Sequence, residues 1–266
     1  MKPQDHKEAA AALLNAEATG QQIGLLTKQF PEMGMDDAYQ VQNAIYQAKL
    51  EMGRHVVGWK IGLTSKAMQY ALGIDIPDSG ILFEDMVFDH GGTVPDDRFI
   101  EPRIEAEIAF IMKTDLSGAD VSRDDVIAAT EAVAPALEIL DTRIYRADPQ
   151  SGATRTVLDT ISDNAANAGL VMGDMRHPVD AFDLRRVGAI VRRNDTVEET
   201  GLGAGVLDDP ALSMAWLVHR LASYGDGLRA GDIVLSGSFV RPIEARHGDH
   251  FIADYGPFGT VDIAFA

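Results

Sequence analysis

PRIEAEIAF, residues 102–110, alternates apolar and charged side chains in the way that is typical of a β-strand with one buried face. Its apolar face consists of Ile104, Ala106, Ile108 and Phe110. The opposite face carries Arg103, Glu105 and Glu107. Two neighbouring carboxylates repel each other, and burial would raise their pKa values, so this face needs a metal ion, a shared proton or a basic partner.

A third carboxylate, Glu138, is the only charge in the apolar run VAPALEIL, residues 133–140. Three carboxylates from two strands would suit a hard divalent cation that keeps open positions for water or substrate. Because a helix is predicted between the two strands, we expect them to lie parallel in one sheet, with Glu107 and Glu138 converging. The alternative is an exposed strand face on which Glu107 is solvated and Arg103 pairs with Glu105.

Composition predicts an ordinary globular protein whose partner is a small molecule. The chain has 266 residues, of which 46% are hydrophobic, enough for a sizeable core. No run approaches the roughly 20 apolar residues of a membrane span, and the N-terminus lacks a signal-peptide core, so a cytoplasmic location is expected. The formal charge of -18 argues against nucleic acid and anionic membranes as partners. With no cysteine, the chain has neither disulfides nor thiolate metal ligands.

The order of elements predicts an α+β fold in two parts. Residues 1–55 contain two helical patterns, and in the second of them Asp36 is the expected N-cap and Gly53 follows the end. Residues 56–266 alternate strands and turns with few helices, which favours a large mixed β-sheet domain. We therefore expect a helical N-terminal cap, 1–55, on a mixed β domain, 56–266.

Local signals define three elements of the second part. A short helix is expected from Thr64 to Leu72, with Gly73 at its end. The pair Asn194 and Asp195 between two short strands predicts a hairpin turn. Asp209, followed by proline, predicts the start of a helix.

Four polar residues outside the acidic strands are candidates for a site. Lys60 is the only charge in the strand VVGWKIG; it either extends to solvent or is a base whose pKa is lowered by burial and a nearby cation. Asp78 follows a proline, as turn-forming residues do. Ser162 either lines a site or caps a turn. Arg241 either binds a carboxylate through both nitrogens or is an exposed loop residue.

Three other motifs fail their context tests. GLGAG, residues 201–205, follows a hairpin and does not open a helix, so it does not indicate a dinucleotide site. His247 and His250 lie in a turn with no further ligand nearby in the sequence, which argues against zinc. SGSF, residues 236–239, lacks the G-x-S-x-G pattern of a serine nucleophile.

Six colinear blocks carry a more specific signal. They are GWKIGLTSKAMQ from Gly58, IPDSGILFEDM from Ile76, RFIEPRIEAEIAF from Arg98, PALEILD from Pro135, DTISDNAANAG from Asp159 and SGSFVRP from Ser236. Together they resemble the hydratase and decarboxylase branch of the fumarylacetoacetate hydrolase superfamily. The blocks DTISDNAANAG and SGSFVRP narrow the resemblance to hydratases that act on a seven-carbon 2-oxo enedioic acid in aromatic degradation.

This resemblance implies a mixed β-roll with a helical N-terminal part, usually assembled as a large homo-oligomer. It implies a Mg²⁺ site with Glu105, Glu107 and Glu138 as ligands, at which a 2-oxo acid chelates the metal. Mn²⁺ accepts the same oxygen ligands. Lys60 then lies beside the reacting carbons, and Asp78 matches the acidic residue that the family has after proline.

The expected reaction is the addition of water to a 2-oxo-heptenedioate after its double bond has shifted into conjugation with the ketone. Lys60 is expected to move the proton between carbons, and Asp78 to guide the water. Ser162 and Arg241 are the expected substrate-binding residues, with Arg241 on the far carboxylate. The alternatives are decarboxylation of a 2-oxo-3-enedioate, hydration of a 2-hydroxypentadienoate, and a metal-binding structural protein without turnover.

Overall fold

The computed structural model describes residues 1–72 and 74–266, without the side chains of Met68, Ala71 and Leu72. Its helices are α1 (Pro3–Thr19), α2 (Leu26–Gln29), α3 (Met35–Glu51), α4 (Lys66–Leu72), α5 (Arg123–Ala129), α6 (Val157–Ser162) and α7 (Pro210–Ala222). The expected end of the α4 segment at Gly73 lies outside the described residues. Within the described ranges, no helix combines the length and the apolar character that crossing a membrane requires.

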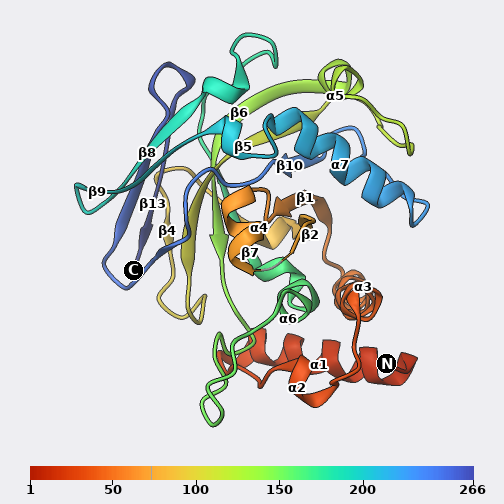
Figure 1. Ribbon diagram of the computed structural model, residues 1–266. Coiled ribbons are helices and arrows are strands. Elements are labelled where there is room, and N and C mark those ends of the chain that lie inside the picture. The colour runs from red at the N-terminus through yellow and green to blue at the C-terminus, as the bar shows by residue number, and fades with distance from the viewer. Residues whose placement is uncertain (73) are drawn as a thin grey trace.

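The strands form two sheets (Figure 1). The large sheet has the order β2 (Asp78–Phe83), β1 (Val56–Gly62), β10 (Ile233–Leu235), β5 (Arg103–Met112), β6 (Thr130–Leu140), β7 (Asn167–Met172), β3 (Val87–Phe88), with β11 (Ile243–Glu244) also paired to β5. The second sheet has the order β4 (Thr93–Val94), β13 (Thr260–Phe265), β12 (His250–Asp254), β8 (Gly188–Arg193), β9 (Thr196–Leu202). The prediction of an α+β fold with mixed sheets and N-terminal helices is confirmed.

The N-terminal helices share a small core of their own. In Figure 1, α1 and α2 lie at one end of the molecule, with α3 and α6 between them and the large sheet. Leu13 of α1 and Val41 of α3 are buried in one cluster with Ile161 of α6, which ties the helices to the rest of the chain. Burial of such apolar side chains contributes roughly 1.5–3 kcal/mol each.

The predicted N-cap of α3 is wrong by two positions. The cap is Gly34, and the helix begins at Met35. Asp37, in the third helical position, accepts a hydrogen bond from the Gly34 amide at 3.0 Å. The carboxylate that caps the helix therefore belongs to Asp37 and not to Asp36. Gly53 follows the helix with a φ of +80°, as expected of a residue that ends a helix in the left-handed conformation.

The two glutamate-bearing strands are antiparallel, which corrects the prediction of a parallel pair. The connection between β5 and β6, residues 113–129, would be long enough for a parallel crossover, so its length does not decide the direction of β6. The chain instead turns back directly, and the Lys113 amide donates to the Ala129 carbonyl at 2.7 Å. This pairing places Glu105 opposite Glu138.

The main core lies between the two sheets and under α7. Phe110 of β5, Phe251 of β12 and Leu217 of α7 are fully buried in one cluster.

Two predictions from the sequence, a hairpin turn and a helix N-cap, are confirmed. Asn194 and Asp195 turn the β8–β9 hairpin with positive φ values of 49° and 70°, and Asp209 caps α7 by accepting from the Ala211 amide at 2.9 Å.

The segment between α6 and β7 adopts a left-handed turn without glycine. Asn164, Ala165 and Ala166 have φ values of 51°, 53° and 59°. The Asn164 side chain accepts from the Ile81 amide at 2.8 Å and donates to the Ile81 carbonyl at 2.9 Å, so it pairs with β2 as a strand would. Left-handed backbone costs roughly 1–2 kcal/mol per residue, which these side-chain bonds offset.

Ala165→Gly should therefore change the free energy of unfolding by less than about 0.5 kcal/mol, because relief of the left-handed backbone offsets the lost methyl group and the added chain entropy. Ala215→Gly is the matched control, since Ala215 is equally buried but lies inside α7. There the expected loss is about 2 kcal/mol. Urea unfolding of both variants measures the difference, and equal losses would contradict the strain at Ala165.

Candidate active site and metal centre

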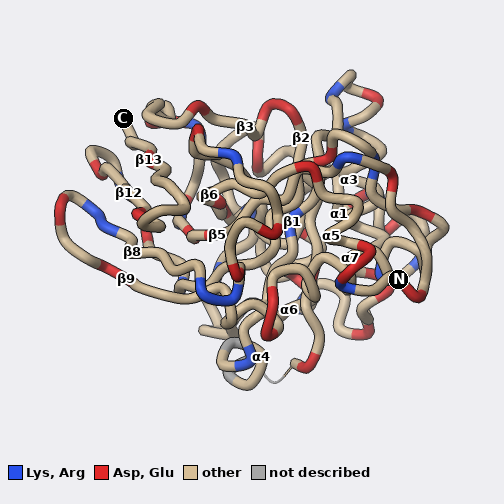
Figure 2. The backbone as a smooth tube through the Cα atoms, turned by 90° about the horizontal axis from the view of Figure 1, so that it is seen from above, with Lys and Arg blue, Asp and Glu red and all other residues tan. Residues whose placement is uncertain are grey.

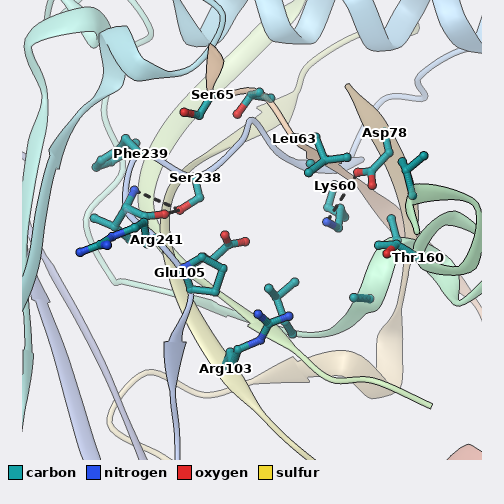
Figure 3. A pocket seen from close by; sticks show the side chains of 18 of the residues that line it. Lys60, Leu63, Ser65, Asp78, Arg103, Glu105, Thr160, Ser238, Phe239 and Arg241 are labelled. Carbon is teal, nitrogen blue, oxygen red and sulfur yellow. Dashed lines mark hydrogen bonds and ion pairs between the residues drawn. The ribbon is translucent and has the colours of Figure 1, made fainter. Parts of the chain in front are cut away.

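Three glutamates meet on the large sheet. One carboxylate oxygen from each of Glu105, Glu107 and Glu138 lies within 4.8 Å of the other two. Glu107 and Glu138 are 0% exposed, and Glu105 is partly buried beside a pocket (Figure 3). The antiparallel register of β5 and β6 brings the three together.

The surroundings of these carboxylates leave oxygens available for a cation. The Gly237 amide donates to Glu107 Oε2 at 2.7 Å, and Asn167 Nδ2 donates to Glu138 Oε1 at 2.7 Å. Glu107 Oε1 and Glu138 Oε2 are buried and have no hydrogen-bond partner among the described residues. Two orphaned carboxylate oxygens beside a third carboxylate form a set of hard oxygen donors, which fits Mg²⁺ or a similar divalent ion.

Gly237 is itself required at this position. Its φ is +122°, and a Cβ there would lie 2.4 Å from Thr64 Oγ1. Only glycine can bring its amide to Glu107 without displacing Thr64. The sequence block SGSF therefore contributes a backbone donor to the three-glutamate cluster.

Burial and mutual repulsion favour the protonated forms of Glu105 and Glu107. Burial, followed by the charge of Glu138, raises the pKa of Glu105 to about 8. The same two causes raise the pKa of Glu107 well above its ordinary value. A divalent cation would remove this repulsion.

The metal-free protein should thus lose stability as the pH rises. Between the ordinary glutamate pKa of 4.5 and the folded value of about 8, the unfolded chain releases a proton that folded Glu105 retains, so unfolding becomes easier until the pH exceeds about 8. The expected loss is on the order of 5 kcal/mol. Thermal unfolding in chelator between about pH 5 and pH 9 measures it, and Mg²⁺ should raise the melting temperature most at the alkaline end. A Mg²⁺ effect that does not depend on pH would contradict this account.

Lys60 and Asp78 lie beside the glutamates, as the sequence predicts. Lys60 Nζ is 3.4 Å from Glu138 Oε1 and 4.0 Å from Asp78 Oδ1. Asp78 is a buried residue at the start of β2, so its interpretation as a turn-former is wrong. The antiparallel pairing of β1 with β2 brings the two side chains together.

The pKa of Lys60 moves opposite to the expected direction. Burial disfavours the ammonium form, but the charges of Glu138, Asp78 and the other two glutamates outweigh it and raise the Lys60 pKa above its ordinary value. Burial also raises the pKa of Asp78, which the Lys60 charge partly offsets. The expected lowering therefore depends on a bound cation and is not a property of the chain's own groups.

The other two predicted residues are not brought to this centre. Ser162 is fully buried, and its hydroxyl donates to the Leu158 carbonyl at 2.8 Å within α6, away from the pocket lining. Arg241 lines the pocket on the opposite side from Lys60, but its side chain is 78% exposed and pairs with Glu199 at 2.5 Å (Figure 3).

Two arginines that the sequence analysis did not select line the same pocket, which has a volume of about 720 Å³. Arg103 shares the polar face of β5 with Glu105, a signal that the sequence carried. The ion pair between them, which was the alternative to a metal site, does not form between the described residues. Arg155 follows a polar loop and had no sequence signal. Both residues belong to the lining of the pocket that a substrate would enter.

Tyr255 fixes the separation of the two acidic strands. Its hydroxyl accepts from the Glu107 amide at 3.0 Å and lies 2.6 Å from the Ala136 carbonyl, to which it donates. Glu107 and Ala136 lie opposite each other in the β5–β6 pair. The hydroxyl therefore lies between the Glu107 amide and the Ala136 carbonyl, which would otherwise bond to each other directly. Tyr255 is 3% exposed.

Tyr255→Phe should lower both the stability and the metal affinity. Loss of the hydroxyl would leave the Glu107 amide and the Ala136 carbonyl without a partner, which costs about 1–3 kcal/mol. Alternatively, the two strands would move together to form the direct hydrogen bond, which would displace Glu107. We expect Mn²⁺ binding, followed by electron paramagnetic resonance, to weaken about tenfold. Phe258→Leu, which alters a buried neighbouring ring, is the control for packing alone. Unchanged Mn²⁺ affinity in a destabilised Tyr255→Phe protein would limit the residue to a structural role.

Comparison with known proteins places the chain in a family. Residues 56–264 match the family described as "Fumarylacetoacetate (FAA) hydrolase C-terminal". The chain belongs to the fumarylacetoacetate hydrolase family. It is 46% identical over 260 residues to the 2-oxo-hept-4-ene-1,7-dioate hydratase of Escherichia coli, covering 98% of this chain and 97% of that protein. It is 37% identical to the 2-keto-4-pentenoate hydratase of Paraburkholderia xenovorans LB400, covering 100% of this chain and 96% of the relative.

A solved structure of this family has the same fold throughout. The 4-oxalocrotonate decarboxylase from Pseudomonas putida G7, in complex with magnesium and adipate, superposes with a TM-score of 0.94. It is 32% identical, over 100% of this chain and 99% of that chain. The same enzyme has been solved with calcium and acetate. The prediction that the chain is an enzyme, a carbon-oxygen lyase, is confirmed by its hydratase relatives.

Proposed function

We propose that this enzyme is a Mg²⁺-dependent hydratase that converts 2-oxo-hept-4-ene-1,7-dioate into 4-hydroxy-2-oxoheptanedioate. One observation carries the proposal: three clustered glutamates with orphaned buried oxygens lie next to Lys60 at a pocket that also presents arginines. The 46% identity to the E. coli hydratase supports the choice of substrate.

The reaction needs charge stabilisation first. Water does not add readily to an isolated alkene, so a carbon-bound proton must move and bring the double bond into conjugation with the ketone. A divalent cation held by Glu105, Glu107 and Glu138 would stabilise the negative charge that develops on the 2-oxo group. Asn167 and the Gly237 amide keep two of these carboxylates in position.

Lys60 supplies the proton transfer. Its ammonium holds a proton at Nζ, 3.4 Å from a glutamate oxygen, and would therefore lie beside a 2-oxo acid held at the three glutamates. A cation would lower the Lys60 pKa towards the range in which the group both donates and accepts. Asp78, 4.0 Å from Nζ, is the residue that we assign to guiding water to C4.

Product identification tests the proposal. The protein, Mg²⁺ and the dienol form of the diacid are mixed, and the product is identified by nuclear magnetic resonance and mass spectrometry. The expected product is the 4-hydroxy diacid. Carbon dioxide released from 2-oxo-hex-3-enedioate in a parallel reaction, without hydration of the seven-carbon diacid, would indicate a decarboxylase, as in the 34% identical 4-oxalocrotonate decarboxylase of Pseudomonas putida, and would overturn the proposal. An unchanged substrate would also overturn it, and parallel reactions with Mn²⁺ and with chelator identify the metal.

We also propose that the enzyme works as a homo-oligomer. The β8–β9 hairpin carries partly exposed apolar side chains, Ile190, Val197 and Leu202, at the edge of the second sheet. Apolar edge strands of this kind are usually covered by another chain. Light scattering on the purified protein gives the mass, and a monomer would contradict the proposal.

A further inference from the structure

We propose that Arg103 and Arg155 bind the far carboxylate of a dicarboxylate substrate and so set the preference for diacids. The inference deepens the proposed function and rests on it for the identity of the metal-bound end. It replaces the role that the sequence predicted for Arg241.

Arg103 lacks the partner that a buried charge normally has. Its side chain is half-buried at the pocket, its Nε is buried without a hydrogen-bond partner, and it pairs with no carboxylate in the described part of the chain. Neighbouring Arg146, in contrast, pairs with Glu101 at 3.2 Å and with Glu244 at 3.5 Å. Since buried charges are ordinarily paired, Arg103 is available to a ligand.

Arg155 also lacks an acidic partner among the described residues. Its Nη1 donates to the Thr142 hydroxyl at 2.5 Å, and within residues 1–72 and 74–266 it forms no ion pair with an acidic side chain. Burial lowers the pKa of Arg103 to about 10, and the charges of Arg146 and Arg155 add to this lowering. Burial also lowers the pKa of Arg155, although the charge of Asp163 partly offsets the effect. An anion between them would relieve both costs.

The chain has many more acidic than basic residues, so an arginine without an acidic partner is unexpected. The sequence has 41 acidic and 23 basic residues other than histidine, and acidic segments are spread over the molecule (Figure 2). The pocket has acidic residues in its lining as well, yet neither Arg103 nor Arg155 forms an ion pair within the described residues. The planar guanidinium fork matches a carboxylate with two parallel hydrogen bonds.

The position along the strand selects a dicarboxylate. Arg103 is two residues from Glu105 on the same face of β5, roughly 6.8 Å along the strand. A chain of a few carbons spans such a distance, so one carboxylate can lie at the glutamates while the other reaches the arginines. In Figure 3, Arg103 and Glu105 border the same central space. Arg241 is less suited to this role, because its side chain is 78% exposed and is already ion-paired with Glu199.

The test compares substrates that differ only in the far carboxylate end. The kcat/KM values for the seven-carbon diacid and for the five-carbon monoacid 2-hydroxypenta-2,4-dienoate are measured in Arg103→Met and Arg155→Met. We expect the diacid to monoacid ratio to fall on the order of 100-fold in each variant. Arg186→Gln removes the same charge from an exposed site and should leave the ratio unchanged.

Equal losses on both substrates would overturn the proposal, and so would a larger fall of the ratio in Arg241→Gln. If a methionine variant does not fold by circular dichroism, Arg103→Lys and Arg155→Lys keep the charge but lose the fork. For these we expect a smaller fall, about tenfold, and an unchanged ratio would overturn the proposal.

Calorimetry separates this inference from the proposed function. Heptanedioate and heptanoate are titrated into the Mg²⁺-loaded proteins, which requires no turnover. Tighter binding of heptanedioate that is lost in the methionine variants supports the arginine site, even if no hydration product forms. Equal binding of the two acids by the unaltered protein would overturn it, whatever reaction the enzyme catalyses.

Discussion

Glu138→Ala should leave the enzyme without measurable Mg²⁺-dependent turnover, a loss on the order of 1000-fold or more. Glu138 contributes an orphaned buried oxygen to the three-glutamate cluster, and its other oxygen is 3.4 Å from Lys60 Nζ. Removing it takes away a proposed metal ligand and an ion-pair partner of the proposed proton carrier. Steady-state kinetics at increasing Mg²⁺, with Mn²⁺ binding measured in parallel, tests both effects.

The matched control for this variant is Glu131→Ala. Glu131 lies on the same strand, β6, but its side chain is exposed. Its replacement should change the activity by less than about twofold. If Glu138→Ala retained its activity at saturating Mg²⁺, the metal assignment would have to be abandoned.

Lys60→Met should reduce kcat by roughly 10²–10⁴-fold, the usual contribution of a general acid-base group, while Mn²⁺ binding is retained. Methionine fills the buried space of the lysine stem but cannot carry the proton. Loss of the ammonium also removes the positive charge that faces Glu138 and Asp78, so metal affinity should stay the same or increase. Pre-steady-state measurement of proton exchange at the substrate carbon identifies the step that is lost.

Lys113→Met is the control, because Lys113 is an exposed lysine at the end of β5 and should tolerate the change. A Lys60→Met enzyme with normal kcat would show that another group moves the proton. A variant that loses Mn²⁺ binding together with activity would instead make Lys60 a support of the metal centre.

Most of the three-glutamate cluster could be predicted from the sequence. The alternation in PRIEAEIAF places Glu105 and Glu107 on one face of a strand whatever its neighbours are, because side chains of a strand alternate by geometry. The isolated Glu138 in an apolar run and Lys60 in an apolar strand were visible for the same reason: a charge among buried residues needs a partner.

Other features depended on the packing of distant segments. The antiparallel register that sets Glu105 opposite Glu138 could not be read from the order of elements, because the connection of residues 113–129 allows either a parallel or an antiparallel return. Tyr255 is 148 residues from Glu107, yet its hydroxyl joins the two acidic strands. No local pattern marks such a contact.

The sequence by itself determined the chemistry available to this protein: an acidic strand face, a single lysine in an apolar strand and the blocks of its family. Only the tertiary structure decided which charges are neutralised by neighbours and which remain for a ligand. Arg241 had the more suggestive sequence position but finds Glu199, whereas Arg103 and Arg155 face the pocket without an acidic partner among the described residues. The physical reason is that pairing and desolvation depend on distances between segments, which the sequence does not contain.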